Sequence, residues 1–136
     1  MNRFERTRAD HRLETAEDYC ELIQDLIKER GEARSVDMAE RLGVSPVAVA
    51  KNIKRLARDG YLIAEPYRSV ELTEEGRQTA DKVRRRHAVV KDFLLWLGVS
   101  EMTAAHDAEG IEHHISDETL AALEAKIYSP SGQTPE

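Results

Sequence analysis

The sequence contains a single cysteine, Cys20. Because no intramolecular disulfide can form, we expect a protein of the reducing cytoplasm. No apolar run reaches the roughly 18 residues that a membrane-spanning helix needs. The N-terminal segment Met1–Arg6 also lacks the apolar core of a signal peptide. We therefore expect neither a disulfide-rich secreted protein nor a membrane protein.

The composition favours a helix-rich protein with amphipathic elements. The 136 residues are 40% apolar and 34% charged, and only 5% are aromatic. A chain of this length folds as one domain or as two small modules that share a core. The formal net charge of −6 argues against nucleic-acid binding through overall charge. It leaves open binding through a local basic patch.

Residues 1–14 are polar and charged without a sustained period, and we interpret them as a flexible arm. Four arginines in this arm could contact phosphates, although a solvated tail is the favoured interpretation. They are Arg3, Arg6, Arg8 and Arg12. A first helix is predicted from Thr15 to about Arg30. Its apolar stripe consists of Tyr19, Ile23, Leu26 and Ile27.

Two short helices joined by a tight turn follow the first helix. Ser35 is expected to cap a helix over Val36–Leu42. Ser45 as N-cap and Pro46 as first helical residue predict a second helix, Pro46–Arg58. The pair forms a helix-turn-helix, in which the second helix enters the major groove of DNA. A solvated Lys/Arg face on an ordinary helix is the less favoured alternative.

A predicted β-hairpin follows, with strands Tyr61–Glu65 and Ser69–Leu72. A hairpin directly after a recognition helix is a wing, so residues 15–73 are predicted to form a winged helix-turn-helix domain. The second helix turns small and basic side chains away from its apolar stripe. The residues expected to contact DNA are Ser45, Pro46, Val47, Ala48, Lys51, Lys54, Arg55 and, at the hairpin tip, Arg68.

Residues 74–97 are predicted to form a long linking helix capped by Thr73. His87 falls on the apolar side of this helix. A lone histidine in such a place is more often a hydrogen-bonded core residue than a metal ligand. The preceding Arg84–Arg86 is expected to be solvated or paired with acidic neighbours.

The C-terminal part of the chain is predicted to be helical over residues 98–128. Ser100 and Ser116 are the expected starts of its two helices. Residues 129–136 have the composition of a disordered tail. The predicted fold is thus mostly α, with an N-terminal winged helix-turn-helix, a small β-hairpin wing and a second, helical region.

Three potential metal ligands, Glu109, Glu112 and His113, stand at positions i, i+3 and i+4. On a helix they share one face. Like charges at such spacings destabilise a helix by about 0.2–0.5 kcal/mol per pair, and Gly110 costs about 1 kcal/mol relative to alanine. The segment therefore has low intrinsic helix stability, and its ligand-type side chains could form half of a metal site.

Asp18 and Glu21, at i and i+3 on the first helix, are further candidates, although an acidic stripe alone is usually a solvated face. With His87 and the C-terminal motif they supply four carboxylates and two imidazoles from three helices. Oxygen-rich sites with imidazole and no thiolate suit Mn(II) or Fe(II). Structural zinc usually requires cysteine and histidine.

Five segments together carry a resemblance to a known family. They are Glu17–Glu21, Asp37–Val44, Leu72–Gly76, Arg86–His87 and Asp107–His114. On these segments the chain resembles the diphtheria-toxin-repressor family, in its manganese-regulator branch. The resemblance implies six metal ligands: Asp18, Glu21, His87, Glu109, Glu112 and His113. It also implies two Mn(II) ions per subunit, with Glu21 and Glu112 shared between them and Fe(II) as a second candidate metal.

The resemblance further implies a homodimer joined through the C-terminal helices, so that residues 98–128 combine dimerisation and metal binding. Such a dimer represses manganese-uptake genes when manganese is plentiful, by binding palindromic half-sites of double-stranded DNA. We expect no catalytic residue, no organic cofactor and no membrane partner.

Two other functions compete with this interpretation. A di-metal carboxylate enzyme in a helical bundle usually carries paired Glu-x-x-His motifs, whereas Glu-x-x-Glu-His occurs here only once. A winged-helix regulator that senses a small organic ligand would leave the C-terminal acids solvated.

Overall fold

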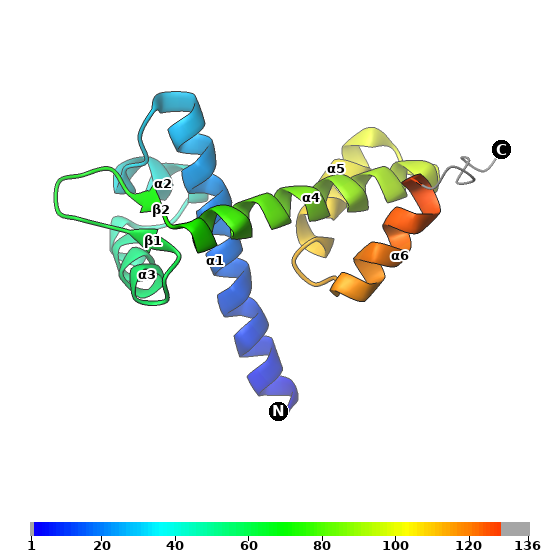
Figure 1. The fold of residues 1–136 in the computed structure, drawn as a ribbon, viewed down its shortest axis with the longest axis horizontal. Coiled ribbons are helices and arrows are strands. Elements are labelled where there is room, and N and C mark those ends of the chain that lie inside the picture. Colours follow the sequence, from blue (N-terminus) through cyan, green and yellow to red (C-terminus); the bar gives the residue numbers. More distant parts are fainter. Residues whose placement is uncertain (1, 129–136) are drawn as a thin grey trace. The chain divides into compact units, whose positions relative to one another are not determined.

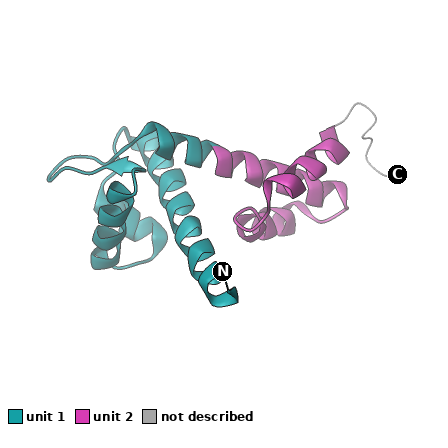
Figure 2. Cartoon of the chain, turned by 60° about the horizontal axis from the view of Figure 1, so that its bottom comes forward, with its two compact units in different colours: residues 1–81 teal, residues 82–136 magenta. Residues whose placement is uncertain are grey.

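The computed structural model describes residues 2–128 and divides the chain into two compact units, residues 1–81 and 82–136 (Figure 2). The elements, in chain order, are α1 (Arg3–Arg30), α2 (Ser35–Leu42), α3 (Pro46–Arg58), β1 (Leu62–Ile63), β2 (Glu71–Leu72), α4 (Glu74–Trp96), α5 (Glu101–Ile111) and α6 (Asp117–Tyr128) (Figure 1). The division between the units falls within α4. The tail expected at 129–136 lies outside the described residues.

Helix α1 begins at Arg3, so the expectation of a flexible arm over residues 1–14 and a helix start at Thr15 is wrong. A capping box fixes the start. The Asn2 side chain accepts a hydrogen bond from the Glu5 backbone N–H, and the Glu5 carboxylate accepts one from the Asn2 N–H. The segment lacks an apolar stripe, but it is rich in residues with high helix propensity.

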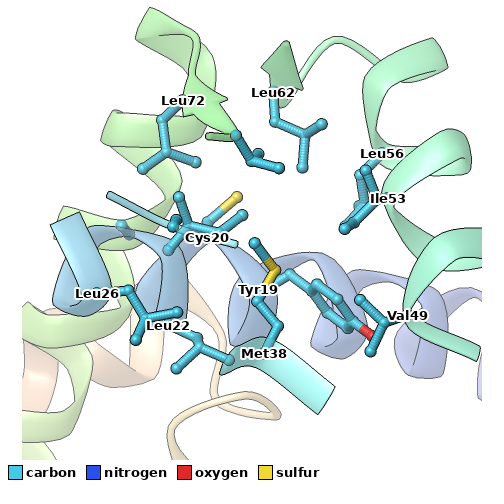
Figure 3. Packing of buried hydrophobic residues seen from close by; sticks show 14 of the residues in the cluster. Tyr19, Cys20, Leu22, Leu26, Met38, Val49, Ile53, Leu56, Leu62 and Leu72 are labelled. Carbon is cyan, nitrogen blue, oxygen red and sulfur yellow. The ribbon is translucent and has the colours of Figure 1, made fainter. Parts of the chain in front are cut away.

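The core of unit 1 forms where one face of α1 packs against α2, α3 and the hairpin (Figure 3). Tyr19, Ile23 and Leu26 of the predicted stripe are buried, and Cys20 is fully buried among them. Ile27 is 37% exposed and lies outside the core. Across from α1 the cluster continues through Met38, Val49, Ile53, Leu56, Leu62 and Leu72.

The helix-turn-helix forms much as predicted. Helix α3 has the expected bounds, and the Ser45 hydroxyl accepts a hydrogen bond from the Ala48 backbone N–H. Helix α2 begins at Ser35 itself, with Arg34 as its N-cap, so the prediction that Ser35 caps this helix is wrong. Gly43 ends α2 with a φ of 66°, a left-handed conformation that favours glycine.

The hairpin is shorter than predicted. Strands β1 and β2 are antiparallel, with Leu62 opposite Leu72. The segment Ser69–Val70 bonds to the loop between α1 and α2 instead of to β1. The Val70 N–H donates to the Ala33 carbonyl (2.8 Å), and the Ala33 N–H donates to the Ser69 hydroxyl (2.7 Å). This contact ends the ladder and holds the base of the wing.

Unit 2 has its own small core. Val89, Val90, Ala108 and Leu120 are buried together, flanked by Leu94, Ile115, Leu123 and Ile127. The Ser100 hydroxyl accepts from the Thr103 N–H at the start of α5, and the Ser116 hydroxyl accepts from the Thr119 N–H at the start of α6, as predicted. Of the helices within residues 2–128, none combines the length and the apolar character needed to cross a membrane.

Candidate metal centre and nucleic-acid interface

The end of α5 carries the acidic motif. Glu109 lies in the last turn of α5, which ends at Ile111, so the motif does not lie within a continuous helix as predicted. Glu112 is the C-cap, with helical dihedrals (φ −57°, ψ −31°) and its N–H bonded to the Ala108 carbonyl. The next turn tightens, because the His114 N–H bonds to the Ile111 carbonyl. Glu109 and Glu112 therefore keep a helical relation, while His113 stands beyond the helix end.

His87 of α4 meets this motif. Its Nδ1 atom lies 2.7 Å from Glu112 Oε2 and 3.8 Å from Glu109 Oε1. Each of the three residues presents one ligand atom, and these atoms lie within 4.8 Å of one another. His113 approaches the other oxygen of Glu112, with Nε2 3.6 Å from Oε1. Four of the six predicted ligands thus come together in unit 2.

Burial sets the electrostatics of the cluster. The Glu112 side chain is 1% exposed, whereas that of Glu109 is 68% exposed. Burial is the main cause that raises the pKa of Glu112 from 4.5 to about 7. The Glu109 charge also raises this pKa, whereas the hydrogen bond and charge of His87 lower it. A buried carboxylate whose charge is disfavoured gains from a nearby cation. The oxygen and imidazole donors of this cluster fit a divalent ion of the Mn(II) or Fe(II) type.

The two remaining predicted ligands belong to the other unit. Asp18 and Glu21 lie on α1 in unit 1, at spacing i, i+3. Their participation in the metal site stays a prediction that rests on the sequence.

Arg86 is a supporting residue whose burial the sequence did not reveal. Its side chain is 10% exposed, and Nη2 donates to Asp117 Oδ1 over 2.9 Å. Lys82 lies 3.7 Å from the same carboxylate, and these cations lower the pKa of Asp117. The sequence left two expectations open for Arg84–Arg86, solvation or pairing with acids, and Arg86 follows the second. Because Arg86 precedes His87, the Arg86–Asp117 bond ties the ligand-bearing turn of α4 to the start of α6.

Helix α3 presents the expected basic surface. Val49, Ile53 and Leu56 are buried, and the predicted DNA contacts lie on the free side. Ser45, Pro46, Val47, Lys51 and Lys54 are exposed, and Ala48 and Arg55 are half-buried. At the tip of the wing the Arg68 side chain is 78% exposed and lies 3.5 Å from Glu65. The placement suits contact with DNA, and the contacts themselves stay predictions.

A hydrogen-bonded chain ties this helix to α1. Asn52 Nδ2 donates to the Tyr19 hydroxyl (3.1 Å), and Arg55 Nη2 donates to Asn52 Oδ1 (3.2 Å). The sequence did not predict these hydrogen bonds, because α1 and α3 come together only in the tertiary fold. They hold Arg55 on the α1 side of the basic surface.

Two family models match the chain. Residues 12–70 match the N-terminal DNA-binding domain of iron-dependent repressors. Residues 73–133 match the metal-binding and dimerisation domain of iron-dependent repressors.

Curated relatives cover most of the chain. It is 56% identical over 120 residues to the transcriptional regulator MntR of Escherichia coli O157:H7, covering 88% of this chain and 77% of that protein. It is 46% identical over 100 residues to the HTH-type transcriptional regulator MntR of Geobacillus kaustophilus (strain HTA426), covering 74% and 71%.

Solved structures of similar fold come from longer chains. A manganese-dependent transcriptional repressor in complex with manganese matches with a TM-score of 0.74 and 29% identity, covering 89% of this chain and 62% of that one. ScaR with bound Zn²⁺ matches with a TM-score of 0.74 and 26% identity, covering 85% and 54%. The present chain spans less than two thirds of each.

Proposed function

The chain belongs to the iron-dependent repressor family, among the relatives of the MntR transcriptional regulators, and we propose that it represses manganese-uptake genes in response to Mn(II). It is a metal-responsive, DNA-binding regulator rather than an enzyme. The competing interpretation, a di-metal carboxylate enzyme, is not favoured, because the relatives carry the names of transcriptional regulators. We place this activity in the cytoplasm.

The observation that carries the proposal is the buried Glu112 carboxylate beside His87, Glu109 and His113. A divalent ion, when bound, would offset the negative charge of this buried carboxylate. Asp18 and Glu21 of α1 would complete the donor set. The family resemblance implies two Mn(II) ions per subunit, which these six residues would hold, with Glu21 and Glu112 as the residues that would serve both ions. The donors include no thiolate, which favours Mn(II), and next Fe(II), over structural zinc.

DNA binding is assigned to α3 and the wing. The exposed Lys51 and Lys54 and the half-buried Arg55 face the major groove, and Arg68 reaches the DNA backbone from the wing. Ser45, Pro46, Val47 and Ala48 at the start of α3 lie against base edges and the sugar–phosphate backbone. A homodimer places two copies of α3 on palindromic half-sites about one helical turn apart.

Metal acts on DNA binding by joining acids of the DNA-binding unit to acids of the dimerisation unit. The joined state fixes the spacing of the two α3 helices, whereas the metal-free dimer samples other spacings and binds weakly. Charge contributes as well, because divalent ions offset part of the net charge of −6 per subunit. Salt screens that contribution beyond about 10 Å.

A direct test measures DNA affinity with and without Mn(II). The probe is a fluorescein-labelled duplex that the wild-type chain selects from a randomised pool in the presence of Mn(II). We expect anisotropy to show tight binding with Mn(II) and weak binding with EDTA. Glu112→Gln removes the buried charge with almost no change in side-chain volume. It should abolish the difference in DNA affinity between Mn(II) and EDTA. Glu118→Gln, an exposed acid on α6, is the matched control and should keep it.

Two results would count against the proposal. Equal affinity of the wild-type chain with Mn(II) and EDTA would remove metal from the mechanism. Calorimetry without Mn(II) uptake, combined with retained DNA binding, would instead favour the regulator of a small organic ligand.

A further inference from the structure

The N-terminal half of α1 has no role in the function proposed above. Residues 3–14 are helical and lie largely exposed. Figure 1 shows this end of α1 continuing beyond α3, the helix assigned to the major groove. This segment carries three acids, Glu5, Asp10 and Glu14, and four arginines, so the position of each arginine around the helix decides what it can contact. The arginines are Arg3, Arg6, Arg8 and Arg12.

The arginines divide between two faces of the helix. At about 100° per residue, Arg8 and Arg12 each lie within about 20° of Tyr19 around the helix axis. Arg3 and Arg6 lie about 140–160° away from Tyr19. Tyr19 marks the face that packs on α3, since its hydroxyl accepts the hydrogen bond from Asn52. Arg8 and Arg12 therefore extend the α3-facing side of α1.

This extension is continuous with the DNA-binding surface. Arg55 donates to Asn52 and so stands beside the Tyr19 contact, between the basic face of α3 and α1. Arg12 and Arg8 follow at about 10 Å and 16 Å from Tyr19 along the helix axis, at about 1.5 Å per residue. They line a surface hollow together with Thr7 and His11.

The distances of Arg8 and Arg12 from Tyr19 are comparable with the width of the major groove that α3 would occupy. The major groove of DNA is about 12 Å wide, and phosphates follow one another about every 3.4 Å along each bordering strand. Arg12 and Arg8, about 10 Å and 16 Å from Tyr19 along α1, can therefore reach the phosphates at the border of the groove. Charge complementarity and continuity with α3 both select DNA as the occupant.

We propose that Arg8 and Arg12 form a second DNA-contacting row, which binds the phosphates bordering the major groove on the α1 side of α3. The row adds affinity without sequence selectivity, because phosphates carry no base information. It rests on the proposed function, since it requires α3 to bind DNA.

The test compares two double variants that remove the same charge. Arg8→Gln/Arg12→Gln removes the proposed row, and Arg3→Gln/Arg6→Gln removes two arginines from the opposite face of the same helix. Glutamine has nearly the helix propensity of arginine, so α1 should persist, and circular dichroism checks this. Anisotropy with the selected duplex and saturating Mn(II) is measured over a series of KCl concentrations.

Each lost phosphate contact lowers the salt slope of log K by about 0.9. We expect Arg8→Gln/Arg12→Gln to lower the slope by at least about 2 per dimer and to weaken binding at least tenfold at low salt. Arg3→Gln/Arg6→Gln should change the slope by less than about 1. Equal slopes for the two variants, or a row variant indistinguishable from wild type, would overturn the proposed row. Failure of the wild-type chain to bind any duplex with Mn(II) would overturn the proposed function and the row together.

Discussion

Glu112→Gln should have opposite effects on stability and on function. In the metal-free chain the folded state holds the Glu112 carboxylate in a buried place, and burial raises its pKa from 4.5 to about 7. At about 1.36 kcal/mol per pH unit, this difference corresponds to about 3 kcal/mol of lost stability once the group is ionised in both states. Glutamine keeps the volume of glutamate and removes the charge. The variant should therefore be more stable than the wild-type chain when metal is absent.

The sign of the pH dependence follows from the direction of the pKa shift. Well below pH 4.5 the carboxyl is protonated in both the folded and the unfolded chain, so the pKa shift does not change the free energy of unfolding. As the pH rises from 4.5 to 7, the unfolded chain ionises first, and the free energy of unfolding falls. The advantage of Glu112→Gln should be below about 1 kcal/mol at pH 5 and about 3 kcal/mol at pH 8.

The fluorescence of Trp96 reports on the unfolding of unit 2, which also contains Glu112. Trp96 is the only tryptophan of the chain and lies at the end of α4 in unit 2. Urea unfolding followed by its fluorescence, in EDTA and at one protein concentration, gives the free energy of unfolding at each pH. Addition of Mn(II) at a hundred times its Kd should then stabilise the wild-type chain by about 2.7 kcal/mol and leave the variant unchanged. A Glu112→Gln chain that is no more stable than wild type at pH 8 in EDTA would refute the reasoning.

Two further predictions concern unit 1. Lys51→Ala should lower the salt slope of DNA binding by about 1 for each lost phosphate contact. Its Mn(II) uptake should stay unchanged by calorimetry, and Lys28→Ala on α1 is the control; an unaltered slope would exclude Lys51 from the interface. Burial raises the pKa of the Cys20 thiol to about 12 from 9.0, so at pH 8 its thiolate fraction falls roughly a thousandfold. Labelling with a thiol reagent should be slower by at least that factor in the native chain than in urea, and comparable rates would contradict the buried position.

The parts of the fold that were predicted well are those fixed by neighbouring residues. Helix α3 begins and ends where the Ser45 cap, Pro46 and Asp59 place its boundaries. The early start of α1 escaped prediction because its signal, the Asn2–Glu5 capping box, precedes a segment without apolar periodicity. Local propensity and the cap suffice to continue a helix that later packing already stabilises.

Features that depend on distant partners were predicted less well. The hairpin ends early because Ser69 and Val70 bond to Ala33, a residue that no local pattern connects with them. At the site, spacing alone indicated Glu109, Glu112 and His113 as part of a metal site. His87 was included only through the family resemblance, because its place on the apolar stripe of α4 favoured a core histidine. That His87 lies closer to Glu112 than to Glu109 follows from the burial of Glu112 at the end of α5, which only the packed structure reveals.

The two halves of the proposed switch differ in what stabilises them. The DNA-binding unit has an apolar core in which Tyr19, Met38 and Leu56 pack without any metal ligand, so α3 should keep its shape in the absence of metal. The unfavourable buried charge lies at Glu112 in unit 2, and Glu112 is not a member of that core. Metal should therefore leave the structure of each basic surface unaltered and act on the dimerisation unit that sets their spacing. On this argument, Glu112→Gln should weaken specific binding to two half-sites much more than binding of unit 1 to a single half-site.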